Sequence, residues 1–293
     1  MSLATIASGL YAERPAGVLY HYTSLGGVLG IVGDRAIRAT DARFFSDAAE
    51  LQHAADSLLH EIGRRQSASP SAVLHQLADW LSHRLTDGNI LFIACFTTRG
   101  NLLSQWRSYC PPGRGVSLGF DAGKLCEQAF TSGFQVGRCV YEPAAQASIV
   151  AAVLDEIQRI AKVRGENTDR STRHPSQSFH GVFEEVETDL LRVAALLKHP
   201  SFHEEDEWRF VSAAVTNYVE APIKYREGAS MLIPYLDLTL PKSVDRDLDI
   251  EHVVLGPTPS SNNSMTSLSR YLSKMRASPR QGLSACQIPY RTW

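Results

Sequence analysis

The segment Ile90–Phe96 constrains the fold of this chain more than any other, because it is a short and uninterrupted run of apolar residues. Asp87-Gly88 precedes it and polar residues follow it. A half-exposed strand alternates apolar and polar residues, whereas a continuous apolar run of this length is typical of a strand buried on both faces. The sequence therefore predicts a sheet that is covered on both sides around this strand.

The pattern around that strand favours an α+β fold with a mixed sheet. Val18–Thr23 predicts a strand that passes almost without a loop into a helix capped by Thr23 or Ser24. Further strand patterns occur at Ala36–Thr40, Val116–Phe120, Glu207–Ser212, Tyr218–Tyr225, Met231–Leu238, Ile250–Leu255 and Ala285–Tyr290. Strands separated by helices in the first half, followed by adjacent strands in the second, are typical of this class.

The composition is that of an ordinary globular protein. The chain has 293 residues, of which 44% are hydrophobic and 20% are charged, which excludes wholesale disorder. This length fits one large domain or two small ones. The formal net charge is −2, so no global field points to nucleic acid or to an anionic membrane as a partner.

Targeting signals and cysteine spacing favour a cytoplasmic protein. No stretch approaches the ~18 to 20 uninterrupted apolar residues of a membrane span, and Met1–Arg14 has no secretory pattern. The five cysteines are dispersed and include no C-x-x-C pair, as expected for reduced thiols. We therefore expect no membrane contact and a cytoplasmic location.

His21 and Thr23 form the first candidate site. They lie two residues apart in a predicted strand, so their side chains project from the same face. Such a histidine is either a core residue that bonds a backbone carbonyl or a ligand-binding group. The spacing alone favours the core residue.

The acidic run Glu204–Glu207 forms the second candidate site. Neighbouring carboxylates repel and raise one another's pKa values, so four in succession at the start of a strand are unusual. Strand alternation places Glu205, Glu207 and Arg209 on one face and the intervening aromatic side chains on the other. This set can form an acid–base site or a site that stabilises a cation, and the alternative is a solvated charge run.

Trp106 and Tyr109 form the third candidate. Their spacing suits a helical turn whose rings pack in the core or serve as a stacking platform, and core packing is the more ordinary role.

No P-loop, dinucleotide-binding or hydrolase-elbow motif occurs. His199 and His203 have no third ligand at zinc spacing, so no metal is expected.

Seven short blocks, taken together and in order, resemble the bacterial domain-of-unknown-function 2971 family over nearly the whole chain. They are Leu19–Leu25, Thr40–Asp47, Ser104–Tyr109, Gly115–Asp121, Glu205–Arg209, Val253–Pro257 and Pro289–Arg291. That family is thought to belong to the ADP-ribosyltransferase superfamily. His21-Tyr22-Thr23 followed by a helix is similar to the His-Gly-Thr strand of diphtheria-toxin-like enzymes, with Tyr22 in place of glycine.

The resemblance implies a role for each of these residues. His21 would bond the adenosine-side ribose of NAD, the backbone at Tyr22 would hold the nicotinamide carboxamide, and Thr23 would support a ribose. Glu205-Asp206-Glu207 resembles the Glu-x-Glu of arginine-directed transferases, which makes Glu207 the catalytic carboxylate and Glu205 its partner. Phe45, Trp106 or Tyr109 would stack on nicotinamide, and Arg209 would complete the NAD-binding set.

The resemblance also implies the architecture. Residues 1–293 would form a single ADP-ribosyltransferase-like domain with helical insertions near residues 47–87 and 143–200. Its mixed, mostly antiparallel split sheet would surround an NAD cleft.

The implied activity is cleavage of the nicotinamide–ribose bond of NAD. ADP-ribose would pass to an unknown macromolecular acceptor, either protein or nucleic acid, without a metal. Such an enzyme would act as a toxin or phage-defence effector and would have an antitoxin or defence partner. An NAD glycohydrolase and an inactive binding or interaction module stay open as alternatives.

Overall fold

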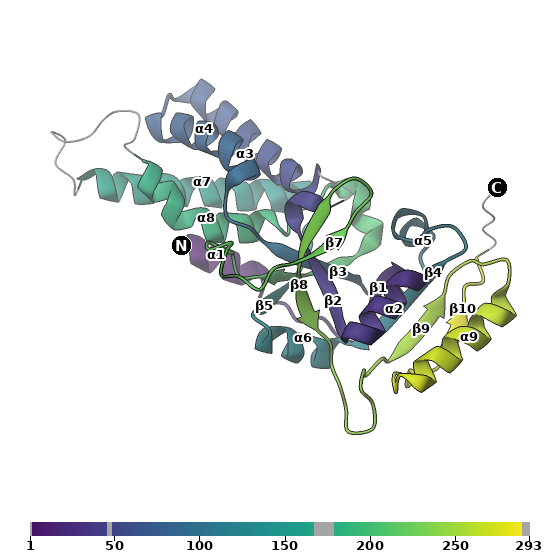
Figure 1. Ribbon diagram of the computed structural model, residues 1–293. Coiled ribbons are helices and arrows are strands. Elements are labelled where there is room, and N and C mark those ends of the chain that lie inside the picture. Colours follow the sequence, from purple (N-terminus) through teal and green to yellow (C-terminus); the bar gives the residue numbers. More distant parts are fainter. Residues whose placement is uncertain (1, 46–48, 167–178, 289–293) are drawn as a thin grey trace.

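The computed structural model describes residues 2–45, 49–166 and 179–288. Ser46-Asp47 and Pro289–Arg291 of the sequence blocks lie outside the described residues, as does the start of the helical insertion expected near residues 47–87. The described chain forms a sheet with helices on it and a helical arm that extends to one side (Figure 1).

Helices and strands alternate along much of the described chain. The α-helices are α1 (Leu3–Leu10), α2 (Leu25–Asp34), α3 (Ala49–Ala68), α4 (Ala72–Asp87), α5 (Leu103–Tyr109), α6 (Ala122–Thr131), α7 (Pro143–Glu166), α8 (His180–Ala194) and α9 (Ser261–Lys274). The strands are β1 (Val18–Ser24), β2 (Ala36–Asp41), β3 (Phe92–Thr97), β4 (Gly115–Asp121), β5 (Phe134–Arg138), β6 (Glu207–Ser212), β7 (Lys224–Glu227), β8 (Leu232–Thr239), β9 (His252–Leu255) and β10 (Leu283–Ala285). Short 3-10 helices occur at Ala42–Phe44 and Pro200–Glu205.

The strands form a ten-stranded sheet that branches at β3. Its main path runs β10-β9-β4-β1-β3-β2-β8-β7, while β6 pairs with β3 and β5. β9 and β10 are parallel, and the other pairings between these described strands are antiparallel. The expected α+β class and the mixed, mostly antiparallel sheet are therefore confirmed.

β3 is buried on both faces, as its apolar run predicts. Phe92 and Phe96 belong to the main hydrophobic core on one face, and Ile93 belongs to a smaller cluster on the other. The main core is closed by α2, α6 and α9, which supply Val28, Leu125 and Leu268. An apolar run suits this strand because five of its six residues are buried, the exception being the partly exposed Cys95.

The helical arm has a hydrophobic cluster of its own. α1, α3, α4, α7 and α8 contribute to it, with Leu3, Leu58, Leu77, Leu154 and Phe183 among its buried side chains. Apart from α1, these helices come from the two regions expected as helical insertions. In the part of the chain that the structure describes, no helix is both long enough and apolar enough to cross a membrane.

Two expected strands are placed differently. The region Tyr218–Ala221 turns, because the Asn217 side chain accepts backbone hydrogen bonds from Val219 and Glu220, and β7 begins only at Lys224. The last described strand ends at Ala285 instead of beginning there.

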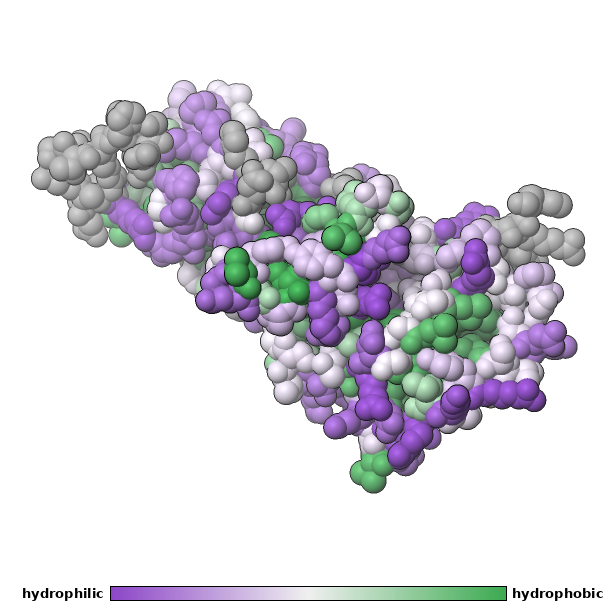
Figure 2. Space-filling view, viewed as in Figure 1, coloured by the Kyte–Doolittle hydropathy of each residue, from purple (hydrophilic) through white to green (hydrophobic). Residues whose placement is uncertain are grey.

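Exposed apolar side chains gather on the segment before β7 and on the β7–β8 hairpin (Figure 2): Tyr218, Val219, Tyr225, Met231 and Leu232.

Gly119 tests the packing between β1 and β4. A Cβ at this position would lie 2.7 Å from Tyr20 Cε1 and 2.8 Å from Val18 Cγ1. We expect Gly119→Ala to lower the free energy of unfolding by about 1–3 kcal/mol, the usual cost of overpacking. The measurement is urea denaturation followed by tryptophan fluorescence.

Gly33→Ala is the matched control, because a Cβ at this position of α2 meets nothing within 4 Å. Alanine is the better helix former, so this variant is expected to gain about 0.5–1 kcal/mol. Equal effects of the two substitutions would contradict the packing between β1 and β4.

Candidate functional site

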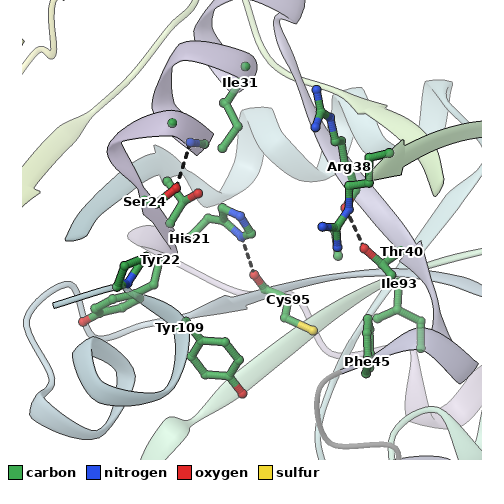
Figure 3. Close-up of a pocket in the computed structure, with 17 residues that line it drawn as sticks. His21, Tyr22, Ser24, Ile31, Arg38, Thr40, Phe45, Ile93, Cys95 and Tyr109 are labelled. Atoms are coloured by element: carbon green, nitrogen blue, oxygen red, sulfur yellow. Dashed lines mark hydrogen bonds between the residues drawn. The ribbon is translucent and has the colours of Figure 1, made fainter. Parts of the chain in front are cut away.

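The sheet opens into a pocket where β1 and β2 separate. β6 pairs with β3 from Ile93 to Thr97 and so occupies one edge of β3. β1 and β2 must share the other edge, where β1 pairs at Thr97 and β2 pairs at Phe92 and Ile93. The middle of this edge therefore has no strand partner, and a pocket of about 570 Å³ adjoins it (Figure 3).

His21 supplies the hydrogen bond that a neighbouring strand would otherwise make. Its Nδ1 lies 2.9 Å from the carbonyl oxygen of Cys95, in the unpaired middle of β3 (Figure 3). Burial lowers the pKa of the His21 imidazole, which favours the neutral ring. A neutral ring that donates from Nδ1 keeps an acceptor lone pair on Nε2. His21 thus makes a structural hydrogen bond through Nδ1 and lines the pocket, and within the described residues its Nε2 has no hydrogen-bond partner.

Tyr22 packs on the other side of β1. Its ring lies 4.5 Å from that of Trp106, centroid to centroid, and its hydroxyl donates to the Arg99 carbonyl at 2.7 Å and accepts from the Leu102 amide at 2.8 Å. Because these contacts anchor the ring, the large side chain at this position is held in a small cluster with Trp106, Cys110 and Val254.

A second pocket of about 50 Å³ adjoins the larger one. The two share His21, Tyr22, Cys95 and Tyr109 in their walls. The smaller pocket is also lined by Glu205, Glu207 and Gln105. His21 of β1 and Glu207 of β6, 186 residues apart in the chain, therefore face one space.

Four buried charges form a cluster behind this second pocket. Lys198 Nζ lies 2.5 Å from Glu205 Oε2 and also bonds Glu207 Oε2. Arg209 Nε donates to Glu207 Oε1 at 3.0 Å, and its Nη1 donates to the Ala195 carbonyl at 2.7 Å. All four side chains are at least 95% buried, so the two acids and two bases balance each other's charge away from water.

This cluster fixes the protonation state of Glu207. Burial alone would raise the pKa of its carboxyl, but the positive charges of Arg209 and Lys198 lower that pKa well below its ordinary range. The Cys95 thiol adds a hydrogen bond that acts in the same direction. Glu207 is therefore an ionised carboxylate with a fixed orientation at the wall of the second pocket.

The expected strand alternation is right for Glu207 and Arg209 but wrong for Glu205. Trp208 and Phe210 face the main core, as expected. Glu205, however, ends the 3-10 helix Pro200–Glu205, and Asp206 then adopts a left-handed conformation with φ of 43°. Glu205 joins Glu207 because both bind Lys198, and the acidic pair is buried instead of solvated.

Three of the remaining candidates line a pocket, and two do not. Thr23 and Phe45 line the larger pocket, and Tyr109 borders both. Trp106 lines neither; it packs behind Tyr22, and its Nε1 donates to Asn101 Oδ1 at 2.9 Å. Arg209 also lies outside both linings, behind the carboxylate of Glu207.

Sequence patterns miss several residues that the structure brings to the site. Lys198 follows the apolar segment Ala194–Leu197, and the signal for it is that two buried acids need a nearby cation. Gln105, which was not a candidate, lies one helical turn before the expected Tyr109 on α5, so both reach the second pocket. Among the described residues, no group of three or more His, Cys, Asp or Glu side chains is arranged to hold a metal ion.

Lys198 holds the two acids together, so its removal should unfold this region. Lys198→Met leaves Glu205 and Glu207 with Arg209 as their remaining cation, and losing one partner of a buried ion pair typically costs about 3–5 kcal/mol. We expect a loss of that size in urea denaturation. Lys224→Met is the matched control, because Lys224 pairs with Asp237 at an exposed position and its loss should change stability little. Equal losses in both variants would contradict the role given to Lys198.

The comparisons with known proteins cover part of this site. No curated protein and no solved structure matches the chain. Residues 105–210, from Gln105 in α5 to Phe210 in β6, match the model of a family described as a protein of unknown function (DUF2971). The matched segment includes Tyr109, Lys198 and both acids, whereas His21 precedes it.

Proposed function

We propose that this protein cleaves the nicotinamide–ribose bond of NAD and transfers ADP-ribose to a macromolecular acceptor. The observation that carries the proposal is the placement of His21 and an ionised Glu207 on the walls of one pocket, which adjoins a larger one. The larger pocket, at about 570 Å³, lies within the range of roughly 300–1,000 Å³ that small-molecule sites occupy.

The pocket walls suit a ligand with sugar and ring groups. Nε2 of His21 and the hydroxyl of Thr23 can bond sugar hydroxyls from β1. Phe45 and Tyr109 provide aromatic surface for a planar ring. Burial raises the pKa of the Tyr109 phenol, so this side chain stays neutral and keeps its hydroxyl proton for donation.

A fixed carboxylate matches the chemistry of this bond. When the bond between C1′ of the ribose and the nicotinamide nitrogen breaks, its electron pair stays on nitrogen and neutralises the ring. The sugar becomes oxocarbenium-like, and a carboxylate beside it stabilises the positive charge as it develops. In this proposal Glu207 is that carboxylate, and the acceptor then bonds C1′ and loses a proton.

Lys198 and Arg209 prepare Glu207 for this task. They keep the carboxylate ionised and oriented before the substrate arrives, so little reorganisation is needed during the reaction. In this proposal Glu205, which also bonds Lys198, accepts the acceptor's proton. Gln105 adds an amide to the same wall, and its side chain makes no hydrogen bond within the described residues.

An exposed apolar surface supports a macromolecular acceptor over water. The β7–β8 hairpin contributes Arg226 to the larger pocket and also carries Tyr225, Met231 and Leu232, which are each about half exposed or more. Exposed apolar groups beside a pocket are typical of surfaces that contact another macromolecule. Hydrolysis of NAD by water is the alternative outcome of the same experiment.

Glu207→Gln is expected to lower nicotinamide release from labelled NAD by at least about 100-fold, because it removes the charge that stabilises the sugar cation. Glu205→Gln is the matched control, since it removes the same charge from the same buried cluster. We expect this control to keep nicotinamide release and to lose label transfer to protein or nucleic acid. Circular dichroism and thermal melting check that both variants fold.

Three results would decide against parts of this proposal. Nicotinamide release at the wild-type rate by Glu207→Gln would exclude its catalytic role. Free ADP-ribose as the product, with no labelled macromolecule, would identify a glycohydrolase. Neither turnover nor NAD binding by the wild type would leave the chain as a binding module without this substrate.

His21→Ala tests ligand contact separately from chemistry. In a Glu207→Gln background, which should consume NAD at least about 100-fold more slowly, loss of the Nε2 hydrogen bond should weaken NAD binding about tenfold in calorimetry. His75→Ala is the control, because that side chain is 75% exposed on α4. An unchanged dissociation constant for His21→Ala would make His21 a structural residue alone.

A further inference from the structure

Two arginines, Arg38 and Arg226, line the larger pocket at its sheet edge. Arg38 is on β2 and Arg226 is on β7, and both strands pair with β8, which lies between them. The guanidinium of Arg38 lies 5.2 Å from the ring centroid of Tyr235 in β8. The two side chains therefore reach one pocket across an intervening strand.

The charges of these arginines are poorly compensated. Arg226 has neither an ion pair nor a side-chain hydrogen bond within the described residues. Arg38 contacts Asp34 at 3.4 Å, which is long for a charged hydrogen bond, and both partners are substantially exposed. Asp237, a nearby carboxylate on β8, bonds Lys224 at 2.5 Å.

The positive charges of the two arginines also repel each other. Burial lowers the pKa of the Arg226 guanidinium, and the positive charge of Arg38 lowers it further. A pair of like charges at a pocket wall raises the free energy of the empty protein, and an anion bound between them removes that cost. Guanidinium groups bind phosphate oxygens, like carboxylate oxygens, through two parallel hydrogen bonds, and a diphosphate offers one anionic group to each arginine.

The α2 wall of the pocket is built largely from glycine. α2 presents Gly26, Gly27 and Gly30 to the pocket, and these three positions add no side chain of their own to it. At Gly30, a Cβ would lie 3.5 Å from Nη2 of Arg38, so this arginine rests directly against the helix. Figure 3 shows Arg38 and Ile31 facing the same space as His21.

We propose that Arg38 and Arg226 form a diphosphate subsite that binds a nucleotide by its phosphates, with the sugar directed toward His21 and Glu207. This inference rests on the proposed function for the direction of the ligand. The binding of a diphosphate by the arginines can nevertheless be tested without turnover. In this proposal the β2–β8–β7 edge of the sheet recognises the negative charge of the ligand. Glu205 and Glu207 lie in a different part of the site.

Calorimetry with ADP-ribose and with adenosine separates phosphate recognition from recognition of the nucleoside. Arg38→Gln/Arg226→Gln should weaken ADP-ribose binding at least tenfold and leave adenosine binding unchanged. Its affinity for ADP-ribose should also vary less steeply with salt concentration, because fewer charged contacts are broken. Arg35→Gln/Arg276→Gln is the matched control, since these exposed arginines both face Asp247 and line neither pocket.

Two further measurements keep the outcome clear. Arg38→Lys/Arg226→Lys retains both charges and should recover part of the lost affinity, which excludes misfolding as the cause. Wild-type affinity for ADP-ribose in the glutamine variant would overturn the subsite, even if NAD is cleaved. Arginine-dependent ADP-ribose binding without NAD cleavage would instead support the subsite and reject the proposed function.

Discussion

The structure depends on how the two edges of β3 are shared. β6 occupies one edge over most of its length, while β1 and β2 divide the other and leave its middle unpaired. A backbone carbonyl in such a gap needs a donor, and His21 provides it to Cys95. The unpaired middle of β3 thus explains both the opening in the sheet and the hydrogen bond that His21 makes at its border. The interpretations of His21 as a core residue and as a ligand-binding residue are compatible, because each uses a different ring nitrogen.

The buried charge cluster plays the corresponding role on the other edge. Lys198, Glu205, Glu207 and Arg209 sum to zero charge, so they can remain ionised without water. Replacing such a group by apolar residues is often neutral for stability or even favourable, so stability alone does not account for it. Its clearer effect is on position, because both oxygens of the Glu207 carboxylate are held by cationic side chains.

Local patterns predicted the elements, and long-range contacts completed the site. β1, the Ser24 cap of α2, β3 and β4 follow from periodicity, capping and apolar runs within a few residues. Alternation failed at Glu205 because the left-handed Asp206 interrupts the strand, which no acidic pattern reveals. Lys198 and Arg226 carry no local signal, because their roles depend on which strands and turns pack beside them. The helical arm was expected as insertions, but its separate core and the inclusion of α1 depend on contacts between distant segments.

The separation of the pocket walls along the chain affects when the pocket can form. β1 is made early during synthesis, whereas Glu207 follows His21 by 186 residues. At about 5–20 residues per second, the ribosome needs on the order of 10–40 s to span that interval. Until β6 is made and docks, Glu207 cannot face His21, and the edge of β3 that β6 occupies in the full chain has no strand from β6 to pair with. A ligand that needs both walls can therefore bind only after the first 207 of the 293 residues have been translated.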